Sequence, residues 1–225
     1  MTETITVRPG QPADVPAIVT TIDEAGFDEA VFSWVIPDEQ ARRERLATGA
    51  EQQTAWVTST LATAEIVTAG TPSREIAGVA VWQFEDGEPE TAPADLTDFF
   101  AQAYGPYAAR MMLVLELTGQ RHPRHEPHWY LQQILVVPAL RGHGLGGALL
   151  RHQLARADAA GVPAYLEASS PRNRALYERY GFQPLGDSIA LPEDGPRLQP
   201  MWRPLRIGRA PAYRLSGSTD VVVGS

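Results

Sequence analysis

A glycine-rich run from Arg141 to Gly147, with the sequence RGHGLGG, contains the residue types that point most directly to chemistry. It follows a stretch rich in β-branched and aromatic residues, 129–137, and leads into an apolar helical pattern that begins at Leu145. Glycines let a backbone approach a ligand without interference from a Cβ atom. The free N–H groups and the positive dipole end of a helix N-terminus then bind anions such as pyrophosphate. The run therefore predicts a site for a phosphate-bearing cofactor.

Two other interpretations of these glycines have less support. Gly142, Gly144 and Gly147 satisfy the G-x-G-x-x-G pattern of dinucleotide-binding folds, and Glu167 follows 20 residues after Gly147. However, residues 138–141 separate the strand pattern from the glycines, and only 58 residues follow Glu167, too few for the further βα units of that fold. A turn that serves only to pack a helix would need four glycines within six positions, each at a cost in backbone entropy.

The residues on both sides of the run match two motifs of a known family. The pattern V-x-P-x-x-R-x-x-G-x-G, from Val136 to Gly146, resembles the acyl-CoA pyrophosphate loop of the GNAT superfamily of N-acetyltransferases. The pattern N-x-x-x-Y-x-x-x-G-F, from Asn173 to Phe182, resembles the second signature of that superfamily. The two motifs occur in the family order and are separated by a helical and a strand pattern. The resemblance covers residues 128–185 in detail.

The resemblance implies a fold and a cosubstrate. The fold is of the α/β (α+β) class, with a mixed, mostly antiparallel central sheet, a splayed strand pair that binds acyl-CoA, and flanking helices. The cosubstrate is acetyl-CoA, whose pantetheine arm and thioester carbonyl would bind the strand backbone of Ile134, Leu135 and Val136. Asn173 would contact the cofactor arm. The pyrophosphate would be held by the loop residues Arg141, Gly142, His143, Gly144, Leu145, Gly146 and Gly147.

The same resemblance implies two catalytic groups. Tyr177 would protonate the departing CoA sulfur, and Glu167 aligns with an acidic residue that serves as the general base in some members. Members differ at this point, so His128, which immediately precedes the cofactor-facing strand, and water remain alternative bases. A base is useful because an alkyl amine with a pKa of about 10.4 is only about one part in a thousand neutral at pH 7. The interval from Glu167 to Tyr177 is shorter than in the branch that modifies protein N-termini.

Three histidines raise the question of a metal site. His122, His125 and His128 recur every three residues, but Pro123 and Pro127 prevent a regular helix from aligning them. The sequence therefore predicts no metal, and a loop near the acceptor site instead.

Composition excludes several enzyme classes. The chain has no cysteine, and all 19 of its basic residues are arginine, so it contains no lysine. A thiol nucleophile, a cysteine-ligated metal and a disulfide are therefore absent. A Schiff-base lysine and a P-loop of the G-x-x-x-x-G-K-[ST] type are absent for the same kind of reason.

Charge and hydropathy predict the partners. A formal net charge of -8 argues against nucleic-acid binding, which needs a surplus of basic residues. A membrane is not expected as a partner, because the chain has no run of about 18 apolar residues and its polar, acidic N-terminal segment lacks the pattern of a signal peptide. We expect a cytoplasmic protein, and the sequence leaves open whether it forms a homodimer.

Apolar periodicity and turn residues predict one domain, residues 1–206, followed by a flexible tail, 207–225. The predicted elements are a strand at 4–8, a helix at 14–26, a helix capped at 37–39 and continuing through 42–45, a hairpin of strands 64–68 and 76–84 turning at 70–73, an exposed loop at 85–93, a helix at 95–116, a strand at 129–137, a helix at 145–160, a strand at 164–168, and a helix at 172–180.

The sequence thus predicts an N-acetyltransferase that moves an acetyl group directly from acetyl-CoA to a primary amine of a small molecule. The alternative is a noncatalytic acyl-CoA-binding sensor or interaction module on the same scaffold. Tyr177 favours the enzyme, because a sensor has no need of an acid at the leaving sulfur. A sensor would bind the cofactor without acceptor-dependent release of CoA thiol.

Overall fold

A computed structural model describes residues 4–87 and 96–205 of the chain. The predicted tail, 207–225, and most of the predicted loop at 85–93 lie outside these residues. Within the described part, no helix is both long enough and apolar enough to cross a lipid bilayer.

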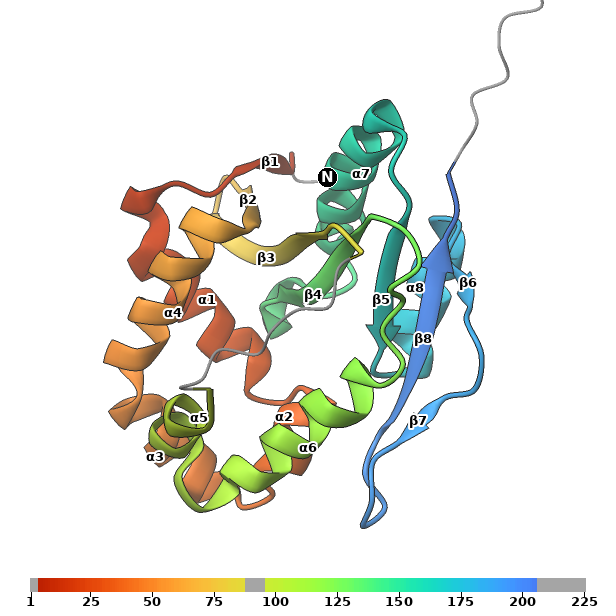
Figure 1. Ribbon diagram of the computed structural model, residues 1–225. Helices are drawn as coiled ribbons and strands as arrows, with labels where there is room; N and C mark the ends of the chain where they lie inside the picture. The colour runs from red at the N-terminus through yellow and green to blue at the C-terminus, as the bar shows by residue number, and fades with distance from the viewer. Residues whose placement is uncertain (1–3, 88–95, 206–225) are drawn as a thin grey trace, which may run out of the picture.

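A single mixed sheet forms the centre of the fold, with the strand order β1-β2-β3-β4-β5-β8-β6 and with β7 paired to β8 (Figure 1). Among the strands that the structure describes, only the β4–β5 pair is parallel. This arrangement confirms the predicted fold class. The strands are β1 (Thr6–Pro9), β2 (Glu65–Thr71), β3 (Arg74–Glu85), β4 (His128–Val136), β5 (Ala164–Ala168), β6 (Gln183–Pro184), β7 (Ile189–Ala190) and β8 (Arg197–Arg203).

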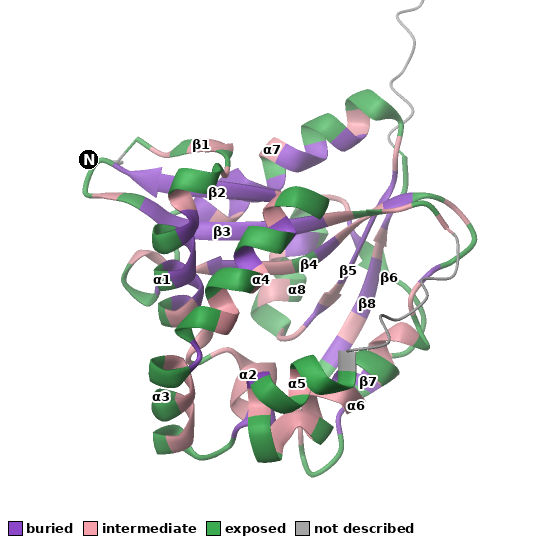
Figure 2. Cartoon of the chain, turned by 60° about the vertical axis from the view of Figure 1, so that its left-hand side comes forward, coloured by how far each residue is buried: buried purple, intermediate pink, exposed green. Residues whose placement is uncertain are grey.

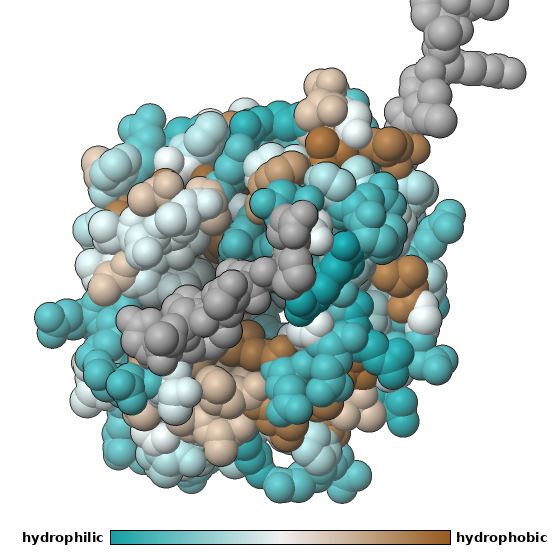
Figure 3. All heavy atoms as spheres, in the orientation of Figure 1, coloured by the Kyte–Doolittle hydropathy of each residue, from teal (hydrophilic) through white to brown (hydrophobic). Residues whose placement is uncertain are grey.

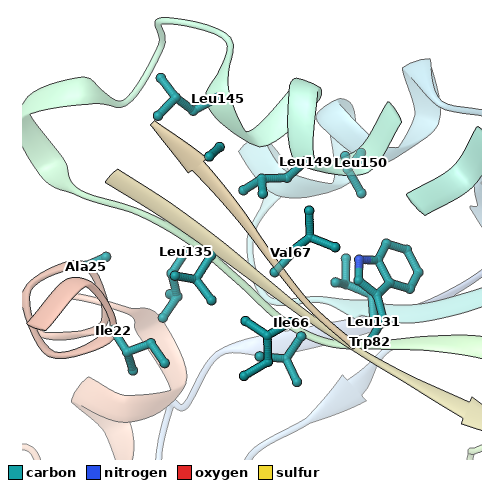
Figure 4. Close-up of a cluster of buried hydrophobic side chains, with 14 of the residues drawn as sticks. Ile22, Ala25, Ile66, Val67, Trp82, Leu131, Leu135, Leu145, Leu149 and Leu150 are labelled. Carbon is teal, nitrogen blue, oxygen red and sulfur yellow. The ribbon is translucent and has the colours of Figure 1, made fainter. Parts of the chain in front are cut away.

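Helices cover the sheet on both sides. Figure 4 shows Leu145 and Leu149 of α7 on one side of the strands and Ile22 and Ala25 of α1 on the other. Figure 2 shows the buried strands enclosed by helices whose outer surfaces are exposed. The helices are α1 (Val15–Gly26), α2 (Ala30–Val35), α3 (Glu39–Thr48), α4 (Ala50–Thr63), α5 (Leu96–Tyr104), α6 (Ala108–Gly119), α7 (Leu145–Ala160) and α8 (Pro171–Arg179).

Local sequence signals explain where several helices begin. The apolar positions Val15, Ile18 and Ile22 of α1 are all buried, as their spacing predicts. Asp38 caps α3, because its side chain accepts a hydrogen bond of 2.7 Å from the Ala41 amide. Gly144 precedes α7 in a left-handed conformation.

The predicted helix over 95–116 is two helices in the structure, so this prediction was wrong in its continuity. The chain breaks between α5 and α6 at Gly105, which has a φ of +53°, and at Pro106. Proline has no N–H for the helical ladder, and glycine tolerates the positive φ, so the pair turns the chain.

A second, smaller apolar cluster lies apart from the main core. It brings α2 and α6 together with the β7–β8 hairpin, at the lower end of the molecule in Figure 1. Figure 3 shows apolar side chains gathered in the lower middle of this face, where α2, α5 and α6 lie. The buried members of this second cluster are Trp34, Val35, Ile36, Val114, Ile189, Leu191 and Leu198.

Candidate active site

The sheet opens into a fork between β4 and β5. The two strands pair only from Trp129 with Ala164 to Leu131 with Leu166, and then diverge (Figure 1). A register shift near Gln132 accompanies the divergence, because Val81 faces Gln133 whereas Trp82 faces Leu131.

Beyond the fork, one backbone edge of β4 is available. Ile134, Leu135 and Val136 remain in register with β3 but have no strand partner on the β5 side among the residues described. The Val136 carbonyl already accepts a hydrogen bond from Arg141, and the remaining unpaired backbone groups at this edge are ready to bind an extended polar chain. The arrangement fits the predicted role of these three residues toward a pantetheine arm.

The glycine run forms the turn between β4 and α7. Gly142 and Gly144 have φ values of +87° and +93°, which residues with a Cβ atom rarely adopt. The first α7 hydrogen bond runs from the Ala148 amide to the Gly144 carbonyl at 2.9 Å. The amides of residues 145–147 precede that bond and are therefore free for a ligand. A negatively charged pyrophosphate fits this turn.

The last two glycines also serve helix packing. A Cβ atom on Gly147 would lie 2.5 Å from the Tyr180 hydroxyl oxygen, and one on Gly146 would lie 3.7 Å from Leu176. Both neighbours belong to α8 or its C-terminal end. The packing explanation therefore applies to Gly147, whereas the positive φ values explain Gly142 and Gly144.

The Arg141 side chain points away from the turn and binds the chain at the end of α1. Its guanidinium donates two hydrogen bonds of 2.6 Å to Asp28 and one of 2.8 Å to the Ala25 carbonyl. Its Nε donates to the Val136 carbonyl at 3.1 Å. The hydrogen bonds from Arg141 hold the pKa of Asp28 below its ordinary value. The guanidinium thus braces the loop, while Nδ1 of the exposed His143 ring lies 3.3 Å from the Arg141 carbonyl.

Helix α8 carries Asn173 and Tyr177 on one side. Ser170 caps the helix by accepting a 3.1 Å bond from the Asn173 amide, and the Asn173 side chain lies 3.5 Å from the Ser169 hydroxyl. Tyr177 is 4% exposed and packs against Phe182. Burial, and then the negative charge of Glu29, raise the pKa of Tyr177, so its hydroxyl stays protonated across the working pH range.

Glu167 lies at the fork, one residue beyond the last β4–β5 pair. The Tyr130 hydroxyl donates a 2.9 Å hydrogen bond to its Oε2. Its Oε1 is buried and has no hydrogen-bond partner in the described chain. Burial raises the pKa of Glu167 to about 7, against the opposing effect of the tyrosine hydroxyls. A carboxyl group that titrates near neutral pH suits general base catalysis.

His128, the alternative base, has both ring nitrogens engaged. Nδ1 lies 3.0 Å from the Glu126 carbonyl, which can only accept, so Nδ1 carries the proton. Nε2 then accepts from Nε2 of His122 at 3.1 Å. These bonds leave no free lone pair on the fully buried ring, which favours Glu167 over His128. In the described ranges, no three or more His, Cys, Asp or Glu side chains group as metal ligands.

One candidate functional residue, Glu29, could not be predicted from the sequence. Glu29 precedes α2, and its Oε2 accepts hydrogen bonds of 2.7 and 3.1 Å from the amides of Val31 and Phe32. The structure brings its charge close enough to raise the pKa of Tyr177, although 148 residues separate them. The only local signal is an acidic residue before a short apolar run, and glutamate is not among the preferred N-caps.

Comparison with known proteins agrees with this geometry. Residues 73–182 match the model of the acetyltransferase (GNAT) family. The chain is similar to a solved structure described as histone acetyltransferase HPA2 and related acetyltransferase from Corynebacterium glutamicum, with 32% identity and a TM-score of 0.67, covering 92% of this chain and 99% of that one.

Two further solved structures share the fold at lower identity. Arylalkylamine N-acetyltransferase 2 from Aedes aegypti is 15% identical, with a TM-score of 0.66 and coverage of 90% and 99%. A polyamine N-acetyltransferase from Drosophila melanogaster is 16% identical, with a TM-score of 0.54 and coverage of 90% and 100%. The forked sheet, the two motifs and the relative of 32% identity together show that the chain belongs to the GNAT family and is an N-acetyltransferase.

Proposed function

We propose that the chain transfers the acetyl group of acetyl-CoA directly to the primary amine of a small molecule. The observation that carries the proposal is the position of Glu167 at the mouth of the β4–β5 fork, with a buried, unpartnered Oε1 and a pKa of about 7. A noncatalytic acyl-CoA sensor would require the fork but not a carboxyl group tuned in this way.

The cosubstrate would be held by backbone groups. The open edge of β4 at Ile134, Leu135 and Val136 would bind the pantetheine arm, and the free amides after Gly144 would bind the pyrophosphate. Asn173 would contact the arm from α8. Arg141 would contribute by bracing the turn rather than by direct contact with phosphate.

The acid–base chemistry uses the two groups whose pKa values burial raises, Glu167 and Tyr177. Glu167 accepts one proton from the ammonium group, the neutral amine nitrogen forms a bond to the acetyl carbon, and the carbon–sulfur bond breaks with its electron pair on sulfur. The second proton leaves the nitrogen to solvent. Tyr177 donates a hydrogen bond to the departing sulfur. Because the pKa of Tyr177 is raised, whereas that of a thiol is about 8.5, the hydroxyl stabilises the thiolate more than it protonates it. The thiolate then takes its proton from solvent.

Glu29 supports a cationic acceptor. Its carboxylate is held by the amides of Val31 and Phe32 at the start of α2, and its charge acts on Tyr177, so a protonated amine would be attracted there before it reaches Glu167. The similar proteins named above are described as acting on polyamine or arylalkylamine, or as a histone acetyltransferase. Each of these acceptors contains an amine and belongs in the test.

The deciding experiment measures acceptor-dependent release of CoA thiol. Polyamines, arylalkylamines, amino acids and a histone-tail peptide are incubated with acetyl-CoA and enzyme, and products are identified by mass spectrometry. Because the chain has no cysteine, every thiol detected is CoA. Stabilisation against heat by acetyl-CoA with no thiol release from any amine would favour the sensor. Acetylation of the histone peptide alone would replace the small-molecule acceptor.

Residues 1–206 would form the whole catalytic domain, with 207–225 as a dispensable tail. The last described strand, β8, ends at Arg203, which forms a buried ion pair with Asp158 of α7. A chain ending after residue 206 should retain the kcat/KM of the full chain.

A further inference from the structure

Arg110 of α6 contacts two segments that lie far apart in the sequence, the end of α2 and the turn between β7 and β8. Its Nη1 donates a hydrogen bond of 2.6 Å to the Trp34 carbonyl, and its guanidinium lies 5.0 Å from the centre of the Trp34 ring. Its Nη2 forms an ion pair with Glu193. One side chain therefore contacts the last turn of α2 and the turn between β7 and β8.

The β7–β8 turn is fitted closely to the same tryptophan. The Trp34 indole N–H donates a 3.0 Å hydrogen bond to the Pro192 carbonyl. A Cβ atom on Gly195 would lie 2.7 Å from that indole nitrogen. Glu193 and Asp194 have φ values of +52° and +55°, a conformation that is costly for a residue with a side chain. A strained turn persists only where surrounding contacts hold it, so these contacts fix the position of the β7–β8 turn against Trp34.

Both ends of α2 are therefore anchored by charged side chains. The helix is only six residues long, so it depends on tertiary contacts for its stability. Glu29 binds the free amides at its start, and Arg110 binds the Trp34 carbonyl near its end. A shift at the end of so short a helix moves its beginning as well.

We propose that Arg110 is a positioning residue, which acts through α2 to hold the Glu29 carboxylate in place at the start of that helix. This inference rests on the proposed function of Glu29 toward a cationic amine. Arg110 lies in α6, between β3 and β4 and outside both sequence motifs. Its effect should be larger on the amine than on acetyl-CoA, because Arg110 contacts neither the glycine turn nor the β4 edge and reaches that turn only indirectly, through Asp28, the neighbour of Glu29 that pairs with Arg141.

The first test compares kinetic and binding constants of Arg110→Met, Arg110→Lys and Arg156→Met. Methionine keeps the packing on Trp34 but removes the donors, and the exposed Glu193 side chain remains hydrated without its partner. Arg156 is the matched control, since it pairs with Glu65 between α7 and β2. Arg110→Met should lower kcat/KM for the amine about 10- to 100-fold, with a much smaller change in the acetyl-CoA Kd. Arg110→Lys should restore part of this, and Arg156→Met should resemble the wild type.

A double-mutant cycle with Glu29→Gln separates positioning from a general effect on folding. Glutamine can still accept from the Val31 and Phe32 amides, so it removes the charge and keeps the cap. Arg110→Met should then cost less than about twofold in the Glu29→Gln background, because the group it positions is already neutral. An equal loss in both backgrounds would overturn the inference.

A measurement without turnover keeps this inference separate from the proposed function. Hydrogen exchange of the Val31 and Phe32 amides should become faster in Arg110→Met and remain unchanged in Arg156→Met. Unchanged exchange in Arg110→Met would overturn the inference even if the enzyme is active. Loss of protection in a protein that transfers no acetyl group would instead refute the proposed function alone.

Discussion

Arg141 and Asp28 form a bidentate ion pair, with both hydrogen bonds at 2.6 Å, although they are 113 residues apart. Asp28 directly precedes Glu29, and Arg141 begins the glycine turn. The pair therefore joins the predicted pyrophosphate loop to the segment that precedes α2. Planar, two-point pairing of this kind is specific to arginine and is not reproduced by lysine.

This pair leads to a prediction that separates bracing from direct phosphate binding. Arg141→Lys keeps the positive charge and Asp28→Asn removes the partner, and both should weaken acetyl-CoA binding about three- to tenfold, consistent with about 1 kcal/mol for an exposed pair. Calorimetric titration with acetyl-CoA measures the effect. If the guanidinium bound phosphate directly, Arg141→Lys would bind nearly normally and Asp28→Asn would not weaken binding. Arg174→Lys, which alters the exposed pair with Glu178, is the control.

The positive φ of Gly144 leads to a second prediction. Gly144→Ala should reduce the affinity for acetyl-CoA at least tenfold and lower the free energy of unfolding by about 1 to 2 kcal/mol, because the turn would have to change its φ of +93°. Gly161→Ala is the matched control, since Gly161 has a φ of +66° at the other end of α7 and open space around it. It should lose similar stability but bind acetyl-CoA normally, as thermal shift with and without the cosubstrate would show. Equal affinities in the two variants would argue against the turn as the pyrophosphate site.

The pKa of Glu167 predicts the pH dependence of turnover. Burial raises this pKa to about 7, so kcat/KM should rise with pH as the base loses its proton. It should reach half of its maximum near pH 7. Glu167→Gln should lower kcat/KM about 10²- to 10⁴-fold and abolish that inflection. Steady-state rates between pH 5.5 and 8.5 test both statements. An unchanged inflection in Glu167→Gln would assign the base to another group.

A fourth prediction concerns stability at acidic pH. Burial lowers the pKa of His122 to about 4, below its ordinary value of about 6.5. Between these values the unfolded chain binds more protons than the folded one, so stability is lost as pH falls from about 6.5 to 4. Because the ring is only partly buried, we expect about 1 to 2 kcal/mol from it.

Denaturant unfolding of Glu167→Gln with and without His122→Gln measures the histidine effect. The Glu167→Gln background is needed because the raised pKa of Glu167 acts with the opposite sign, favouring the folded state at low pH and losing that contribution as pH rises to about 7. A His122→Gln variant with the wild-type acid sensitivity would contradict the assignment.

Removing only the hydroxyl of Tyr177 should slow turnover without affecting cosubstrate binding. Tyr177→Phe keeps the packing against Phe182, and the thiolate needs less help than a poorer leaving group, so the fall in kcat should be about tenfold or less. Single-turnover rates and an acetyl-CoA titration on the same variant provide the two readouts. Wild-type turnover at every pH would make Tyr177 a packing residue.

The parts of the fold that could be predicted are those whose signal is local. The buried face of α1, the Asp38 cap and the strand at 164–168 all follow from patterns within one segment. The break at Gly105 and Pro106 is also local, and an apolar pattern that continues on both sides concealed it. Helix α4 gives a weak pattern, since only Val57 and Thr60 of its residues are buried.

The parts that could not be predicted depend on distant contacts. Helix α2 is held by hydrogen bonds of Trp34 to Arg110 and Pro192, which lie far from it in the sequence. Its own six residues carry no signal of a stable helix. Strand β8 inserts between β5 and β6, an order that no neighbouring residues specify. Glu29 could be recognised only once the fold had brought it to Tyr177. The glycine turn, by contrast, combines conformational need and chemistry in one short segment, and for that reason it was visible in the sequence.

The fork has a mechanical consequence. β1 to β4 form one plate and β5 to β8 another, and within the sheet only three residue pairs, from Trp129–Ala164 to Leu131–Leu166, form the seam between them. Beyond this short seam, the two halves of the sheet are joined through helices and not through the strand ladder, as by the Arg203–Asp158 ion pair between β8 and α7. The separation of β4 and β5 beyond Leu131 therefore depends on side-chain contacts of the helices as well as on backbone pairing.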